Sequence, residues 1–217
     1  MIGRFVLAFA ALLGYLGVWA LVLLPVALAL RGDAEIMLVV VAVTLVLSGG
    51  GIIPYLDFVA KRVFRFKGEG PPLAEPALRA LIAQVNDLDV PVTVAERGRK
   101  LVLTWRYVDA KWWDVLSTSG LRSVYELHVK LDERRKVATL VDVEKSVRWS
   151  VGPGHVRVWG GYFRGLMLEY SVGAQWGIKE NFEVGRVYAY SFDPSEIKNP
   201  IMNSILRSGW DVRFGLW

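Results

Sequence analysis

The sequence predicts an α-helical transmembrane hairpin followed by an α+β domain that is mainly antiparallel β-structure. Three observations support this prediction. Two apolar runs fill most of the first 60 residues, a short Gly- and Pro-rich stretch follows, and apolar and polar residues then alternate along much of the remaining chain. The predicted parts are a hairpin with a basic segment over 1–67, a tether over 68–76 and a β-rich domain over 75–217.

The first apolar run, residues 5–30, contains 26 residues without a charged side chain. A helix of that length, rising 1.5 Å per residue, crosses a hydrocarbon core of about 30 Å. The second run, residues 36–60, contains Asp57 near its end and the interrupting stretch Ser48–Gly51. We expect a continuous but kinked span, because residues 36–47 alone are too short to cross. A helix broken at the glycines is the alternative.

A cleaved signal peptide is a competing interpretation of the first run. Ala27, Leu28 and Ala29 have the small-x-small form of a cleavage site. The apolar stretch is about twice as long as that of a usual signal, which favours an uncleaved span. The chain has no cysteine, which fits a reducing compartment.

Positive charge predicts the orientation, because loops that stay in the cytoplasm carry an excess of Lys and Arg. The loop between the runs has one cation beside two acidic residues, whereas four cations follow the second run within seven residues. We therefore expect a multi-pass protein of the inner membrane with both termini in the cytoplasm. The same segment mixes cations with aromatic residues, as segments that lie on anionic headgroups do. Its candidate lipid-surface residues are Lys61, Arg62, Phe64, Arg65, Phe66 and Lys67. The alternative is that these charges only set topology.

Small residues within the runs offer surfaces for close helix packing. Ala10 and Gly14 are four residues apart in the first run, and Gly49–Gly51 lie in the second. They pack the two spans on each other or pack two copies together as a homo-oligomer.

Asp57 precedes Lys61 by four residues, which is the helical spacing of an ion pair. We favour this ion pair over a role of Asp57 as a proton or ion ligand.

The domain should open with an amphipathic helix over 75–86, where apolar residues recur at helical spacing. The period then changes to two. Residues 100–108 and 123–132 alternate apolar and polar side chains, and 123–132 should pair with 136–144 as an antiparallel hairpin across a charged turn.

Further strands are predicted after this hairpin, joined by Gly-containing turns, at 146–151, 155–159, 162–171, 174–182 and 184–192. Many short strands with tight connections predict a meander folded into a barrel or sandwich. A short late helix should follow, with Asn199 as its N-cap, Pro200 in its first turn and Gly209 as its left-handed terminator. Residues 210–217 then form a last strand or a docked tail.

No catalytic, cofactor or metal site is predicted. His128 lies on a strand face that we expect to be solvated, and His155 follows a Gly-Pro-Gly turn, so neither has a close sequence partner for zinc. One alternative is a metal site in which a histidine converges in space with Glu169 or Asp142. A second is an enzyme site that converges from separate strands, using His128, Glu126 or Glu169. Such a site would need a polar pocket with two titratable groups.

Ser195 and Lys198 match the Ser-x-x-Lys pattern of acylating enzymes, but the companion Ser-Asp-Asn and Lys-Thr-Gly elements are absent. We interpret the match as a polar turn before the late helix. Tryptophan is abundant, and Trp105 fits the inward side of its strand. Trp112 and Trp113 are adjacent, so they cannot both face inward on one strand, and one of them is a candidate partner contact.

After residue 60 the chain has 24 Lys and Arg residues against 18 Asp and Glu residues, and four of the cations belong to the basic segment. This mild excess argues against a nucleic-acid partner, for which a denser basic face is expected. The expected partners are the lipid bilayer and either a protein or a second copy of the chain, without a cofactor.

Two segments, SVYELHVKLDERRKVATLVDVEKSVRW and YAYSFDPSEIKNPIMNSILRSGW, carry a resemblance to bacterial membrane-anchored proteins with a β-rich cytoplasmic domain and no known activity. The resemblance covers most of residues 90–212 and implies no catalytic residue. In architecture the domain is loosely similar to tubby-like and scramblase-like barrels. We therefore expect a membrane-anchored, non-enzymatic binding or scaffold protein, with anionic-lipid binding or lipid handling as the alternative.

Overall fold

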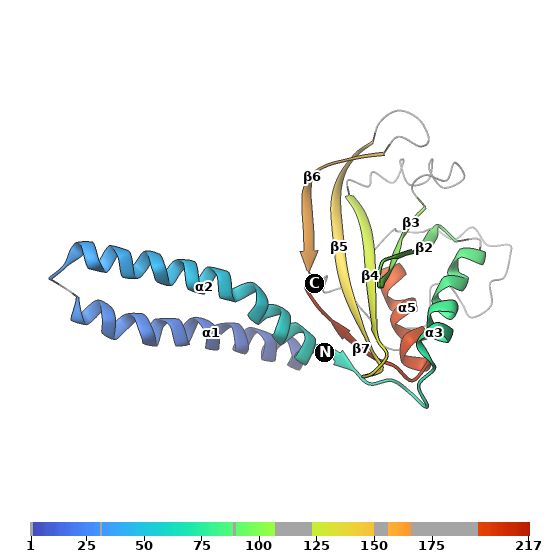
Figure 1. The fold of residues 1–217 in the computed structure, drawn as a ribbon, viewed down its shortest axis with the longest axis horizontal. Coiled ribbons are helices and arrows are strands. Elements are labelled where there is room, and N and C mark those ends of the chain that lie inside the picture. Colours follow the sequence, from blue (N-terminus) through green and yellow to red (C-terminus); the bar gives the residue numbers. More distant parts are fainter. Residues whose placement is uncertain (1, 31, 89, 107–122, 150–155, 166–194) are drawn as a thin grey trace. The chain divides into compact units, whose positions relative to one another are not determined.

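The computed structural model describes residues 2–30, 32–88, 90–106, 123–149, 156–165 and 195–217. The chain divides into two compact units between Phe64 and Arg65. The first unit contains two long helices, and the second is an α+β domain with a mostly antiparallel sheet (Figure 1). The predicted division into a long helical hairpin and a β-rich domain with a late helix is therefore confirmed at this level.

The two long helices are α1 (Ile2–Ala29) and α2 (Ala34–Val63). Both are long and apolar enough to cross a membrane. Asp33 caps α2, because its Oδ1 accepts a hydrogen bond from the Ile36 N–H at 3.1 Å. The α2 helix runs without a break through its three glycines, as predicted, so the second run lies in one continuous helix of 30 residues.

Two tyrosines join α1 to α2. The Tyr15 hydroxyl donates to the Ser48 carbonyl at 2.6 Å, and the Tyr55 hydroxyl donates to the Ala11 carbonyl at 2.8 Å. The two rings stack with centroids 4.8 Å apart. A Cβ on Gly51 would lie 2.8 Å from the Tyr15 hydroxyl, so this glycine makes room for the tyrosine. Small-residue packing within the hairpin is therefore seen at Gly51.

Most of the hairpin surface is apolar and exposed. No side chain between Gly3 and Ala29 is buried, and the buried residues of α2 are Thr44, Asp57, Val59 and Ala60. Asp57 forms the predicted ion pair with Lys61, four residues on. The carboxylate near the end of the second run is therefore paired within its own helix.

The domain is built on a seven-stranded sheet whose main path runs in the order β1-β7-β5-β4-β3-β2, with β6 also paired to β5. Strand β7 is parallel to β5, and every other pair is antiparallel. The sheet strands are β1 (Arg65–Phe66), β2 (Val92–Arg97), β3 (Lys100–Trp105), β4 (Ser123–Asp132), β5 (Val137–Trp149), β6 (Val156–Gly165) and β7 (Asp211–Phe214).

Strand β5 organises this sheet, because β4 pairs with it along its length and two other strands share its second edge. Strand β7 pairs with residues Val137–Leu140, and β6 pairs with residues from Asp142 to Trp149. The path through the described strands is open, with β1 and β2 at its ends, whereas the sequence predicted a barrel or sandwich. The antiparallel hairpin of β4 and β5 and the meander from β2 to β6 are confirmed.

Two strand predictions are corrected. Residues 146–149 are the end of β5, not a separate strand, and a register irregularity between Lys145 and Val147 lets the strand continue. The described residues of the strands predicted at 155–159 and 162–171 form one strand, β6, which passes through Gly160 and Gly161; residues 155 and 166–171 lie outside the described part of the chain. The strands predicted at 174–182 and 184–192 lie outside the described residues.

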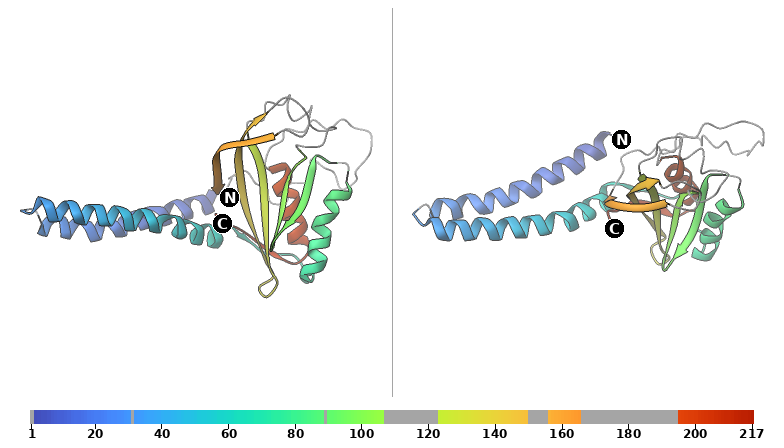
Figure 2. Two further views of the ribbon diagram at one scale, coloured as in Figure 1. Left: turned by 45° about the horizontal axis from the view of Figure 1, so that its top comes forward. Right: turned by 90° about the horizontal axis from the view of Figure 1, so that it is seen from above.

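Helices cover one face of the sheet (Figure 2). The predicted opening helix is α3 (Glu75–Ala83), continued by a 3-10 turn, η1 (Gln84–Asp87), and it buries Leu78 and Ile82. The late helix is α5 (Ser195–Arg207), and it buries an apolar face formed by Ile201, Met202, Ile205 and Leu206.

The predicted start of the late helix is wrong. Helix α5 begins at Ser195, so Asn199 and Pro200 lie inside it rather than at its N-cap and first turn. Ile197 and Lys198 are buried, and packing of this first turn outweighs the cap signal that Asn199 and Pro200 give. The terminator is confirmed, because Gly209 has a φ of +77°.

The stretch between β1 and α3 lies against the turn between α5 and β7. The Glu69 N–H donates to the Leu206 carbonyl at 2.7 Å, and the Leu73 N–H donates to the Ser208 carbonyl at 3.0 Å. A Cβ on Gly68 would lie 2.5 Å from the backbone of Gly209. These Gly- and Pro-rich residues are irregular, as predicted, and their backbone is fixed to the domain.

The outer edge of β2 is covered by side chains. The Asn86 amide accepts from the Val94 N–H at 2.8 Å and donates to the Val94 carbonyl at 2.9 Å. The Arg106 guanidinium donates to the Val92 carbonyl at 3.0 Å. These contacts occupy backbone groups that would otherwise pair with another strand.

Candidate functional site

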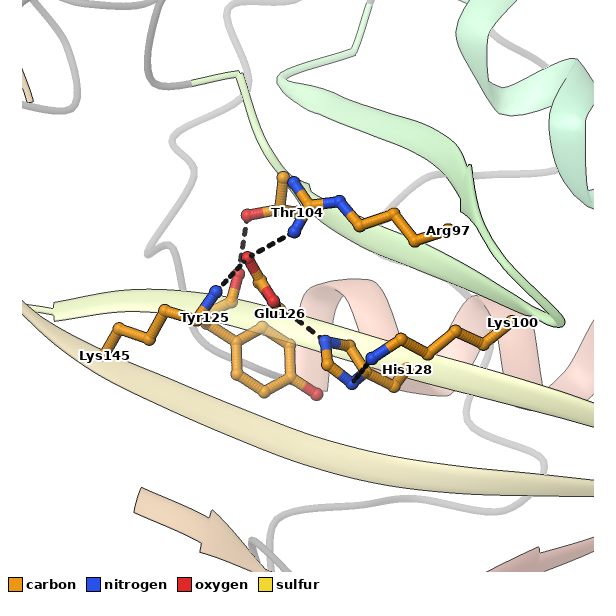
Figure 3. A network of polar contacts seen from close by, with 7 residues as sticks. All are labelled: Arg97, Lys100, Thr104, Tyr125, Glu126, His128 and Lys145. Atoms are coloured by element: carbon orange, nitrogen blue, oxygen red, sulfur yellow. Dashed lines mark hydrogen bonds and ion pairs between the residues drawn. The ribbon is translucent and has the colours of Figure 1, made fainter. Parts of the chain in front are cut away.

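A polar network lies on the sheet face opposite α5, around Glu126 and His128 of β4 (Figure 3). Both residues are buried, with 5% and 4% of their surface exposed. The prediction that His128 lies on a solvated face is therefore wrong. Alternation correctly predicts which side the residue faces, but the second face of the sheet is also buried at this position.

Three nitrogen-bearing side chains lie beside the Glu126 carboxylate. Its Oε2 lies 2.8 Å from His128 Nε2, and its Oε1 lies 2.6 Å from Lys145 Nζ and 3.6 Å from Arg97 Nη1. The hydrogen bond with His128 and the charge of Lys145 lower the pKa of Glu126 from 4.5 to about 2, against the opposing effect of burial. This carboxylate therefore stays ionised at any physiological pH.

The contacts of His128 define its tautomer. Its Nδ1 lies 3.0 Å from Lys100 Nζ. A lysine ammonium has only donors, so Nδ1 accepts from Lys100, and Nε2 carries the ring proton and donates to Glu126. The network runs from Lys100 through His128 to Glu126.

This arrangement is suited to holding charge rather than to moving a proton. A carboxylate beside an imidazole is the usual support of a general base, but such a base needs a free ring nitrogen to take a proton. Here Lys100 occupies one nitrogen of His128 and Glu126 occupies the other. The nearby Thr104 hydroxyl donates to the Tyr125 carbonyl at 2.7 Å, so it is not poised as a nucleophile.

Metal binding finds no support in the described part of the chain, where no group of three or more His, Asp or Glu residues could hold an ion. Asp142, a possible partner of His128 from the sequence, lies on the opposite face of the sheet, because it pairs with Leu127 rather than with His128. Glu169 and His155 lie outside the described residues.

A second polar cluster is buried between the sheet and α5. Lys198 Nζ donates to Asp142 Oδ2 at 2.7 Å, and the Tyr125 hydroxyl donates to Asp142 Oδ1 at 2.6 Å. Lys198 also lies over the Phe214 ring, 5.4 Å from its centroid. The interpretation of the Ser195–Lys198 match as a polar turn before the late helix is wrong, because these residues form the first turn of α5 and Lys198 is held in an ion pair in the core.

The predicted lipid-surface residues fall into different structural settings. Lys61 and Arg62 end α2, and Lys61 is paired with Asp57. Phe64 is buried and its ring lies 5.3 Å from that of Phe5. Arg62 is exposed.

Arg65 and Phe66 form strand β1, and Lys67 follows it as an exposed residue. Arg65 pairs with Asp211 at 2.7 Å, and the Phe66 ring lies 5.7 Å from that of Phe214. Burial raises the pKa of Asp211, but hydrogen bonds from the Gly68 N–H and from Arg65 outweigh it and lower that pKa. The Arg65–Asp211 pair therefore stays charged, and the lipid role of this segment stays a prediction.

The candidate partner contacts Trp112 and Trp113 lie outside the described residues. Trp105 is buried, with 1% of its surface exposed, as predicted. Trp210 is buried too, and its indole N–H donates to the Leu73 carbonyl at 2.8 Å.

Sequence reasoning missed the Asp142–Lys198 pair and the roles of Arg97 and Lys145. A signal for the first was present. Asp142 continues the inward alternation of Ala138 and Leu140, and Lys198 precedes Ile201 by three residues on the buried stripe of α5. Two opposite charges at core positions are the pattern of a buried ion pair.

Comparison with known proteins gives no family. No protein-family model, curated protein or solved structure matches the chain. The predicted likeness to bacterial membrane-anchored proteins and to tubby-like or scramblase-like barrels therefore stays a prediction, and function is argued from the residues alone.

Proposed function

We propose that this chain is a membrane-anchored, non-enzymatic binding or scaffold protein that presents its β-rich domain at the cytoplasmic face of the inner membrane. The supporting observation is the exposed apolar surface of α1 and α2, which extends over helices of 28 and 30 residues. Soluble proteins rarely expose contiguous apolar surface of this size. A hydrocarbon core about 30 Å thick would cover it.

The orientation follows from charge. Lys61 and Arg62 close α2, and Arg65 and Lys67 follow, whereas Asp33 and Glu35 lie at the other end of the hairpin. An excess of cations at one end favours retention of that end in the cytoplasm. The amino terminus and the domain then share the cytoplasmic side.

Binding is favoured over catalysis by the state of the buried polar groups. Both ring nitrogens of His128 are engaged, and Lys198 is paired with Asp142 inside the core. The partner is a second copy of this chain or another protein. Asn86 covers the edge of β2, so the partner binds through a side-chain surface rather than by adding a strand there.

Association of two copies is supported by glycines on the hairpin. A Cβ added at Gly14, Gly49 or Gly50 would meet nothing within 4 Å, so their backbone is open to close approach by another helix.

The experiment that tests the proposed function first washes membranes with alkaline carbonate and then measures the mass of the detergent-solubilised chain by light scattering. Retention in the membrane pellet is expected, together with either a protein mass of at least twice 24.3 kDa or a co-purifying protein. A soluble chain contradicts the anchoring, and a bare monomer contradicts the scaffold role.

The alternative is binding of anionic lipid. It is favoured by the exposed cations Arg62 and Lys67 beside the end of the hairpin. In membranes without anionic lipid, the β-rich domain should then no longer contact the lipid headgroups, while the hairpin should stay inserted.

A further inference from the structure

A line of paired positions crosses the whole main path of the sheet and is occupied almost entirely by basic residues. Each residue of the line is the register partner of the next, from the edge strand β2 to the edge strand β1. We call this line the basic row. In strand order from β2 to β1 its residues are Arg97, Lys100, Lys130, Thr139, Arg213 and Arg65.

All six residues lie on one face, because directly paired residues in a sheet point to the same side. It is the face opposite α5, since Lys198 of that helix reaches Asp142, which alternates with Thr139 along β5. Five strand-to-strand spacings of about 4.8 Å give the row a length of about 24 Å.

The ends of the row are open to solvent. The side chains of Arg97 and Arg65 are 58% and 54% exposed, and Lys130 is exposed between them. Thr139 is buried, and its hydroxyl accepts from Arg213 Nε at 2.8 Å, which fixes the arginine beside it. The row is thus exposed at both ends and at Lys130, and its arginine next to Arg65 is anchored by Thr139.

This face carries more positive than negative charge. Among the strand residues of this face whose side chains the structure describes, six are basic, the five cations of the row and Lys145, and three are acidic, Glu126, Asp132 and Asp211. Like charges at directly paired positions repel each other, as at Arg97 with Lys100 and Lys100 with Lys130. An anionic surface laid along the row would relieve this repulsion.

We propose that the basic row is the surface by which the domain lies on anionic phospholipid headgroups of its own membrane. The proposal rests on the proposed membrane anchoring. Arg65 directly follows Phe64, the C-cap of α2, and one residue spans at most about 3.6 Å. Chain connectivity therefore keeps one end of the row next to the end of the hairpin, where the negative potential of the cytoplasmic leaflet is strongest.

The test uses the full-length chain in nanodiscs of phosphatidylcholine, with or without phosphatidylglycerol. The chain has no cysteine, so Ala95→Cys supplies a single labelling site. Ala95 is exposed and lies two residues before Arg97 on the same face of β2. A donor dye there should transfer energy to headgroup-labelled lipid more efficiently when phosphatidylglycerol is present, and high salt should abolish the increase.

Two matched variants distinguish an effect of the basic row from an effect of the total charge of the domain. Arg97→Gln with Lys130→Gln should lower the apparent affinity of the domain for the anionic surface by about five-fold for each cation removed, so half-maximal transfer should need a higher fraction of phosphatidylglycerol. Arg134→Gln with Arg135→Gln removes the same charge from the turn after β4 and should change it little. Thermal unfolding of both variants should match that of the parent chain.

Transfer that does not depend on phosphatidylglycerol overturns the proposal, as does an equal loss in the two variant pairs. A failure of the anchoring is seen separately, as loss of the chain from carbonate-washed membranes. A chain that stays in the membrane but shows no lipid-dependent transfer therefore refutes the basic row alone.

Discussion

Lys198 of α5 donates a hydrogen bond of 2.7 Å to Asp142 of β5, with 0% and 2% of the two side chains exposed. The Tyr125 hydroxyl of β4 donates to the other oxygen of the same carboxylate at 2.6 Å. One carboxylate therefore joins two strands to the helix that covers them. A buried ion pair fixes the position of a helix on a sheet, because every other arrangement leaves a charge without its partner.

Removal of one partner of this pair should be costly. Lys198→Met leaves the Asp142 charge in the core and is expected to lower the free energy of unfolding by about 3–5 kcal/mol. The double variant Lys198→Met with Asp142→Leu should recover most of this loss, because no charge is then buried. Urea unfolding in mild detergent measures both, with the exposed Lys67→Met as the control. Equal stabilities of parent and single variant would contradict the role of the pair.

Stability should depend on the ionisation of Glu126. Its pKa is lowered from 4.5 to about 2 in the folded chain, so its contribution is complete above pH 4.5 and is lost as the pH falls towards 2. The difference corresponds to about 3 kcal/mol. Unfolding free energies measured across this range should fall less steeply for Glu126→Gln than for the parent. A matched change at the exposed Glu69 should leave the slope unaltered, and an unchanged slope for Glu126→Gln would refute the prediction.

The Asn86 side chain should protect the edge of β2. Asn86→Ala leaves the Val94 N–H and carbonyl without their present partner and is expected to lower the free energy of unfolding by about 1–3 kcal/mol. It should also increase concentration-dependent association, because the uncovered edge can pair with another chain. Light scattering and urea unfolding test this, with Gln84→Ala on the same turn as the control. Association that is no greater than in the control would show that the edge is protected by other means.

The local pattern of the sequence was enough to predict much of the architecture. The charge-free run predicted α1, the continuous second run predicted α2, and strict alternation predicted β4 with Leu127 and Val129 in the core. These signals depend on the periodicity of apolar residues within one element, and this periodicity can be observed in the sequence itself. The same holds for the Asp57–Lys61 pair, whose partners are one helical turn apart.

The remaining features depend on contacts between distant elements. The burial of His128 requires cover on the second face of the sheet, and alternation contains no information about that cover. Asn199 and Pro200 have the residue types of a helix start, but the packing of Lys198 on Asp142 extends α5 towards Ser195. The basic row joins residues up to 148 positions apart, Arg65 and Arg213, so only the register reveals it.

The most direct test of the account is the topology of the chain in intact cells. Gly32→Cys in the hairpin loop and Arg134→Cys in the turn after β4 each give a single cysteine. A membrane-impermeant maleimide should label Gly32→Cys from outside and should label Arg134→Cys only after lysis. Labelling of Arg134→Cys in intact cells, or recovery of the chain in the aqueous fraction without detergent, would contradict a hairpin that anchors a cytoplasmic domain.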